Sequence, residues 1–111
     1  MDMESIKETF ASLKETDIRS LPNYQVMDMM IQKLINNGMQ ENLAARLVGK
    51  MKISVSQNVF DENASDLAEC VSGFAEFLNN THKTLMEDYG KLTGTDILMD
   101  MAPSFEFELN L

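Results

Sequence analysis

Two residues able to take part in covalent chemistry, Cys70 and His82, occur in a chain of 111 residues that has no other cysteine or histidine. Such a pair makes a nucleophile when the two side chains lie within hydrogen-bond reach. They stand twelve positions apart on one predicted helix, which separates them by roughly 18 Å at 1.5 Å per residue. This separation excludes direct contact within a subunit, so we expect no nucleophilic catalysis and a His82 side chain at the surface.

The residues that other kinds of site require are also missing. One cysteine and one histidine do not supply a metal cluster. Gly73, Gly90 and Gly94 are scattered singly and do not form a phosphate-binding loop. No strand–turn–helix elbow presents a serine nucleophile. We therefore predict that the protein is not an enzyme and that it uses no metal and no cofactor.

Acidic residues dominate the chain, with 18 Asp and Glu against 9 Lys and Arg and a net charge of −9. The imbalance lies between Asp61 and Leu111, a segment with eleven acidic residues and only two basic ones. Gln40 to Val59 resembles a helix-turn-helix of repressor type, but Ser54 to Phe60, where bases would be read, carries no basic residue. Phosphate contacts need Lys and Arg, so we do not expect direct nucleic-acid binding. A basic surface on another protein is the better match.

A long helix from Asn63 to Gly90 organises the chain. Its apolar residues recur at steps of three and four and share one face: Ala64, Leu67, Val71, Phe74, Leu78 and Leu85. Acidic residues form a stripe opposite this face, interrupted by Lys83: Glu62, Asp66, Glu69, Glu76 and Glu87. The stripe is either a solvated helix face or a surface that meets a basic groove or imitates a row of phosphates.

A line of small residues runs beside the apolar face of this helix, with Gly73 next to it. A glycine inside a helix costs about 1 kcal/mol relative to alanine. Close approach of another helix would compensate for that cost, so we expect close packing at Gly73, either within the fold or across a dimer.

Shorter helices should pack on the long one. Capping signals and apolar spacing predict helices from Ser5 to Asp17, from Pro22 to Asn37 and from Gln40 to Met51. After the long helix we expect a turn over Lys91 to Gly94 and a short helix from Ile97 to Met101.

Two stretches alternate apolar and polar residues as strands do. The first, Ile53 to Phe60, is equally consistent with a strand, an extended connection or the start of the long helix. The second, Ser104 to Leu111, predicts a strand with one apolar and one acidic face. This tail has three possible uses: pairing with Ile53 to Val59, pairing across a dimer, or capture of another protein.

Together these features predict a mainly all-α fold, a small bundle of about four helices with one long helix (about 60–90) and an extended tail able to form a strand. We assign residues 1–103 to one helical domain and 104–111 to a C-terminal amphipathic tail. We see no signal peptide and no membrane span, and we expect a cytoplasmic protein. We also expect a homodimer, because three shorter helices hardly cover so long a helix.

The predicted function is that of a small acidic, non-enzymatic protein-binding regulator: an adaptor, inhibitor or assembly chaperone that occupies a basic or hydrophobic groove of a larger protein. The alternative is a DNA mimic or transcription regulator that acts on a nucleic-acid-binding protein or on DNA. The predicted partner-binding residues lie in the tail and on the long helix: Phe105, Glu106, Phe107, Glu108, Leu109, Leu111, Glu62, Asp66, Glu69 and Glu76.

Overall fold

The computed structural model describes residues 22–109, so the predicted helix from Ser5 to Asp17 and the terminal Leu111 lie outside the described residues. Within that range the chain forms five α-helices, one short 3-10 helix and two strands. In chain order these are α3 (Pro22–Asn36), α4 (Glu41–Lys50), β1 (Lys52–Val55), α5 (Gln57–Glu62), α6 (Ala64–Tyr89), α7 (Lys91–Met101), η2 (Ala102–Ser104) and β2 (Glu106–Leu109). The mainly all-α prediction with one long helix is confirmed.

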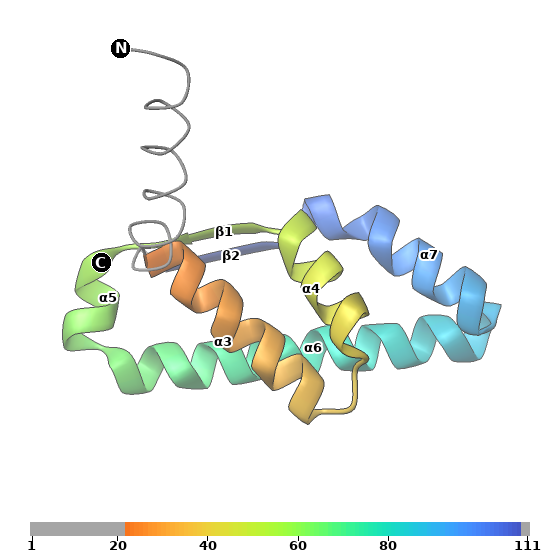
Figure 1. Cartoon of the computed structure of the whole chain (residues 1–111), viewed down its shortest axis with the longest axis horizontal. Coiled ribbons are helices and arrows are strands. Elements are labelled where there is room, and N and C mark those ends of the chain that lie inside the picture. Colours follow the sequence, from red (N-terminus) through yellow and green to blue (C-terminus); the bar gives the residue numbers. More distant parts are fainter. Residues whose placement is uncertain (1–21, 110–111) are drawn as a thin grey trace, which may run out of the picture.

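Helix α6 is the longest element and runs along one edge of the molecule, with α4, α7 and both strands on the same side of it (Figure 1). Helices α3 and α7 make the most extensive contacts with α6. The side chains that α6 buries recur at steps of three and four: Leu67, Val71, Ala75, Leu78, Asn79 and His82. No helix in residues 22–109 is both long and apolar enough to cross a bilayer.

Helices α6 and α7 are joined by Gly90 alone, whose φ of 90° and ψ of 162° are accessible to glycine and to almost no other residue. The predicted turn over Lys91 to Gly94 is therefore wrong, because these residues form the first turn of α7. Gly94 is not a helix breaker here. A Cβ at Gly94 would lie 2.6 Å from the carbonyl carbon and oxygen of Leu85, so glycine lets the two helix backbones meet.

Strands β1 and β2 pair in parallel, with Ile53 opposite Phe107 and Val55 opposite Leu109. Of the three uses foreseen for the tail, the structure shows pairing within the chain. The ambiguous stretch also divides, because Lys52–Val55 is the strand and Gln57–Glu62 is helix α5. The other edge of β1 is partly capped by α3, since the Val55 amide donates to Asn23 Oδ1 at 2.6 Å.

The apolar face of β2 joins the core through aromatic contacts. Phe107 is buried, and its ring meets that of Phe74 edge-on at 5.6 Å between centroids. Phe105 meets Phe77 in the same way at 6.0 Å. The tail is therefore anchored to α6 by its aromatic side chains and to β1 by its backbone.

Candidate functional site

One side of α6 is largely exposed in the part of the chain that the structure describes, although Phe105 contacts Phe77 there and Glu76 and Asn80 line a pocket with the end of α3. With 100° of rotation per residue, ten exposed residues fall on one arc of about 120°. We call this arc the outer α6 face: Asp66, Glu69, Cys70, Gly73, Glu76, Phe77, Asn80, Thr84, Glu87 and Asp88. The helical periodicity that buries Leu78 and His82 on one side of α6 leaves these residues on the other.

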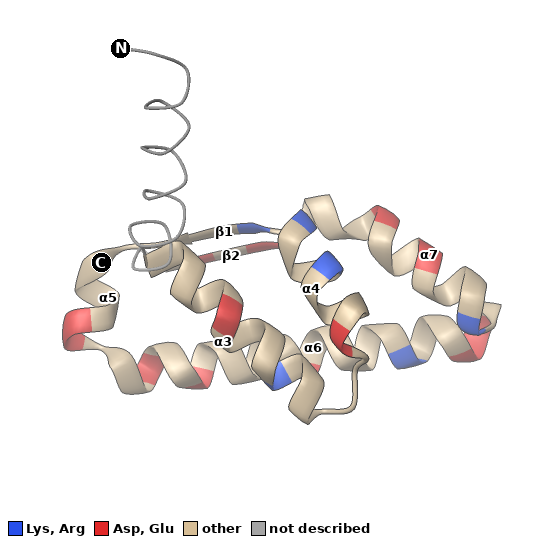
Figure 2. Ribbon diagram, in the orientation of Figure 1, with Lys and Arg blue, Asp and Glu red and all other residues tan. Residues whose placement is uncertain are grey.

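The acidic side chains of the outer α6 face lack cationic partners. None of Asp66, Glu69 and Glu76 makes an ion pair within residues 22–109. Figure 2 shows acidic and no basic residues at α5 and along the first half of α6, whereas basic residues lie on α3, α4, β1, the second half of α6 and the start of α7, with further acids on α3, α4, β2 and α7. An ion pair does form on the sheet, where Lys52 Nζ lies 3.6 Å from Glu106 Oε1. The outer α6 face thus retains its negative charge.

An aromatic side chain lies in the middle of this charged arc. Phe77 is 50% exposed although its ring contacts those of Phe74 and Phe105. Gly73, one turn away, has no atom within 4 Å of the position that a Cβ would take. The close packing expected at Gly73 is therefore not found within residues 22–109, and the alternative of packing across a dimer stays a prediction.

The structure separates the ten predicted partner-binding residues into groups. Three of the acids share the outer α6 face, and Glu62 is exposed at the end of α5. Glu106 and Glu108 are exposed on the far side of β2 from Phe107. The apolar residues of the tail are turned inwards: Phe107 is buried, and Phe105 and Leu109 are half-buried.

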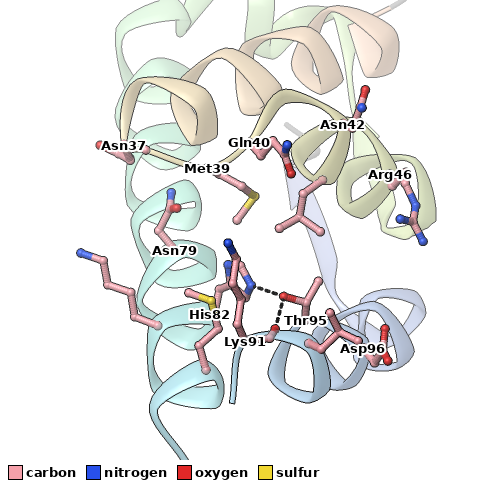
Figure 3. Close-up of a pocket in the computed structure, with 15 residues that line it drawn as sticks. Asn37, Met39, Gln40, Asn42, Arg46, Asn79, His82, Lys91, Thr95 and Asp96 are labelled. Atoms are coloured by element: carbon pink, nitrogen blue, oxygen red, sulfur yellow. Dashed lines mark hydrogen bonds between the residues drawn. The ribbon is translucent and has the colours of Figure 1, made fainter. Parts of the chain in front are cut away.

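A second candidate site is a pocket of about 640 Å³ between the α3–α4 turn, the start of α4, the second half of α6 and the start of α7 (Figure 3). We call it the α4–α6–α7 pocket. Three cationic side chains line it, Arg46, Lys83 and Lys91, together with one acid, Asp96. Segments far apart in the chain form this pocket, and sequence reasoning did not find it.

His82 lies in the wall of this pocket and is only 8% exposed, so the expected surface position is wrong. Thr95 Oγ1 donates its one hydrogen to the Lys91 carbonyl at 2.7 Å. The contact of 2.9 Å between His82 Nε2 and Thr95 Oγ1 therefore requires the histidine to donate, which selects the neutral tautomer protonated at Nε2. Burial lowers the pKa of His82 below its usual 6.5.

A signal for this position was present in the sequence. His82 stands four residues after Leu78 and three before Leu85, which puts it on the apolar face of α6. Because histidine is polar, it was not counted among the apolar residues of that face. Elsewhere in residues 22–109 no three His, Cys, Asp or Glu side chains are grouped closely enough to hold a metal ion.

Comparisons with protein-family models, with curated proteins and with solved structures find no match to this chain.

Proposed function

We propose that this protein is a small acidic, non-enzymatic regulator, an adaptor, inhibitor or assembly chaperone, that occupies a basic surface of a larger protein through its outer α6 face. One observation carries the proposal: within residues 22–109, acids that make no ion pair, Asp66, Glu69 and Glu76, share one largely exposed side of the long helix with the half-exposed Phe77. We place this activity in the cytoplasm, in keeping with a lone exposed thiol, Cys70.

Phe77 and the acidic side chains would have different roles in binding. A half-buried aromatic ring held by neighbouring rings loses little freedom when a partner covers it, so Phe77 would be the apolar anchor. Acids at its rim would attract a basic surface and raise the association rate. The tail would contribute indirectly. The ring of Phe105 packs against that of Phe77, and Phe107 is buried in the core and not available to a partner.

The DNA-mimic alternative receives less support from the same face. A row of phosphates is continuous in charge, whereas the row of Glu69 and Glu76 meets a basic residue, Lys83, at the next seven-residue step along α6. An exposed aromatic ring favours an apolar contact on a protein partner. The mimic stays a proposal that the same experiment distinguishes.

The test is quantitative affinity capture from the native host with three forms of the full chain. The first is the wild type, and the second carries Asp66→Asn, Glu69→Gln and Glu76→Gln. The control carries Asp28→Asn, Glu41→Gln and Asp100→Asn, which remove the same charge from α3, α4 and α7, where all three are exposed. We expect a partner that is depleted at least tenfold with the outer-face variant and retained with the control.

The Phe77→Ala variant then separates the two hypotheses. An adaptor anchored by Phe77 would lose its partner, whereas a mimic would keep binding with strong salt dependence. Equal capture by the wild type, the outer-face variant and the control would contradict the proposal.

A further inference from the structure

We propose that the α4–α6–α7 pocket binds a small hydroxylated anion, of the class of sugar phosphates and hydroxy acids. This inference is independent of the proposed function, because none of the residues that line the pocket belongs to the outer α6 face. A volume of about 640 Å³ lies in the range of small-molecule sites, which is roughly 300–1,000 Å³.

The charge of the α4–α6–α7 pocket is opposite in sign to that of the rest of the described chain. Residues 22–109 contain six basic side chains and thirteen acidic ones, yet three of the six line this one pocket, against a single acid. Arg46, Lys83 and Lys91 make no ion pair within the described range. Cations gathered without partners in an acidic chain favour an anionic ligand.

The start of α4 supplies backbone donors to the pocket. Gln40 precedes the helix in an extended conformation and gives it no side-chain cap. The first amides of a helix have no partner inside the helix, and they lie at the positive end of its dipole. Gln40, Asn42 and Leu43 all line the pocket, so this helix start adds donors to the charge of Arg46.

Two polar side chains are buried in the wall of the pocket, Asn79 and His82, which are 9% and 8% exposed. Figure 3 shows both extending from α6 towards the space between α6 and α4. Asn79 Nδ2 donates to the Ala75 carbonyl at 3.2 Å, which leaves its Oδ1 as an acceptor. His82 Nε2 donates to Thr95, which leaves Nδ1 as an acceptor.

Donors at the rim and acceptors in the wall define the ligand chemistry. Arg46, Lys91 and the α4 amides match an acid group, and the two acceptors match ligand hydroxyl groups. An alcohol with no acid group would engage only the wall, and a simple anion would engage only the rim. A hydroxylated anion engages both.

The test is an amide NMR titration of the full chain with glycerol 3-phosphate. We expect saturable shifts at the amides of Asn42 and Leu43 and at the side-chain amide of Asn79. Inorganic phosphate should bind at least threefold more weakly, and glycerol should produce no shift. Glycerate binding as tightly as glycerol 3-phosphate would also support the site and would identify a carboxylate as the preferred acid group.

Two matched variants locate the site. Replacing Arg46→Gln and Lys91→Gln together should weaken binding at least tenfold. Replacing Lys50→Gln and Lys52→Gln removes the same charge from exposed residues outside the pocket, and it should change the affinity less than twofold.

Three results would overturn the inference. One is the absence of saturable shifts with both acids at 20 mM. Another is equal weakening by the two double variants, which would show unspecific charge attraction. The third is movement of the pocket amides with protein concentration instead of ligand, which would assign the pocket to a second copy of the chain.

Discussion

At the scale of single residues, His82 shows how burial selects a protonation state. Its Nε2–H is donated to Thr95, and desolvation holds its pKa below 6.5. The charged side chains that line the same pocket are Lys83, Lys91, Arg46 and Asp96. Desolvation by burial disfavours the protonated, positively charged form of His82.

This arrangement predicts a pH dependence of stability. The unfolded chain binds the His82 proton near pH 6.5 and the folded chain only at lower pH, so the free energy of unfolding should fall as the pH drops below about 6.5 and stop falling at the folded pKa. One such group changes it by at most about 1.4 kcal/mol per pH unit.

Urea unfolding at pH 7.5, 6.5 and 5.5 measures this effect. The His82→Gln variant keeps a side-chain N–H donor but does not titrate, so it serves as the control for carboxylates that protonate in the same range. We expect the difference in stability between wild type and variant to shrink or reverse towards pH 5.5. A difference that is constant with pH would contradict the role given to His82.

At the scale of elements, β2 is part of the folded body. Its backbone pairs with β1, where the Lys52 amide donates to the Phe105 carbonyl and the Ser56 amide donates to the Leu109 carbonyl, each at 3.0 Å. We therefore expect Phe107→Ala to cost about 3–5 kcal/mol of stability. Phe105→Ala, at a half-buried position, should cost clearly less. Equal and small losses in denaturant unfolding would show that β2 is not anchored.

Gly94, where α6 and α7 meet, and Gly73, on the outer α6 face, provide a matched pair of glycine substitutions. Gly94→Ala should destabilise the protein by about 1–3 kcal/mol, because the new Cβ would meet the Leu85 backbone. Gly73→Ala fills open space on an exposed helix and should stabilise it by about 0.5–1 kcal/mol. Thermal unfolding measures both. Destabilisation by Gly73→Ala would indicate that another helix covers this site in solution.

The elements themselves could largely be predicted from local signals. The apolar period of three to four located α6, Pro22 marked the start of α3, and Gly38 marked its end. Local signals failed where a distant contact decides the outcome. Gly94 resembles a turn residue until Leu85 is placed beside it. Which segment the tail would pair with was equally undetermined, because the partner strand lies about fifty residues away.

At the scale of the whole molecule, the same distinction separates the two candidate sites. The acids of the outer α6 face come from one helix, so helical spacing was enough to group them. The α4–α6–α7 pocket is built from the α3–α4 turn and three helices, and no local pattern connects Arg46 with Lys91. Its polar wall also lies on a face that apolar periodicity assigns to the core.

The predicted homodimer would need an interface other than the outer α6 face. Pairing through the outer α6 face would bring the acids of two copies together, which costs free energy. The α6–α7 turn instead exposes a large aromatic side chain that does not line the α4–α6–α7 pocket, Tyr89 at 59%. We expect sedimentation equilibrium to give a dimer that Tyr89→Glu dissociates. A wild-type monomer at 100 µM would contradict the dimer.

The most direct test of the central proposal uses Cys70, the single cysteine of the chain, which lies exposed on the outer α6 face. The measurement is its rate of maleimide modification in the free protein and in the captured complex. The control carries Cys70→Ser and Thr93→Cys, which moves the thiol to an exposed position on α7. We predict at least tenfold slower modification of Cys70 in the complex and an unchanged rate at position 93. Equal rates for Cys70 in the free and bound protein would contradict binding through the outer α6 face.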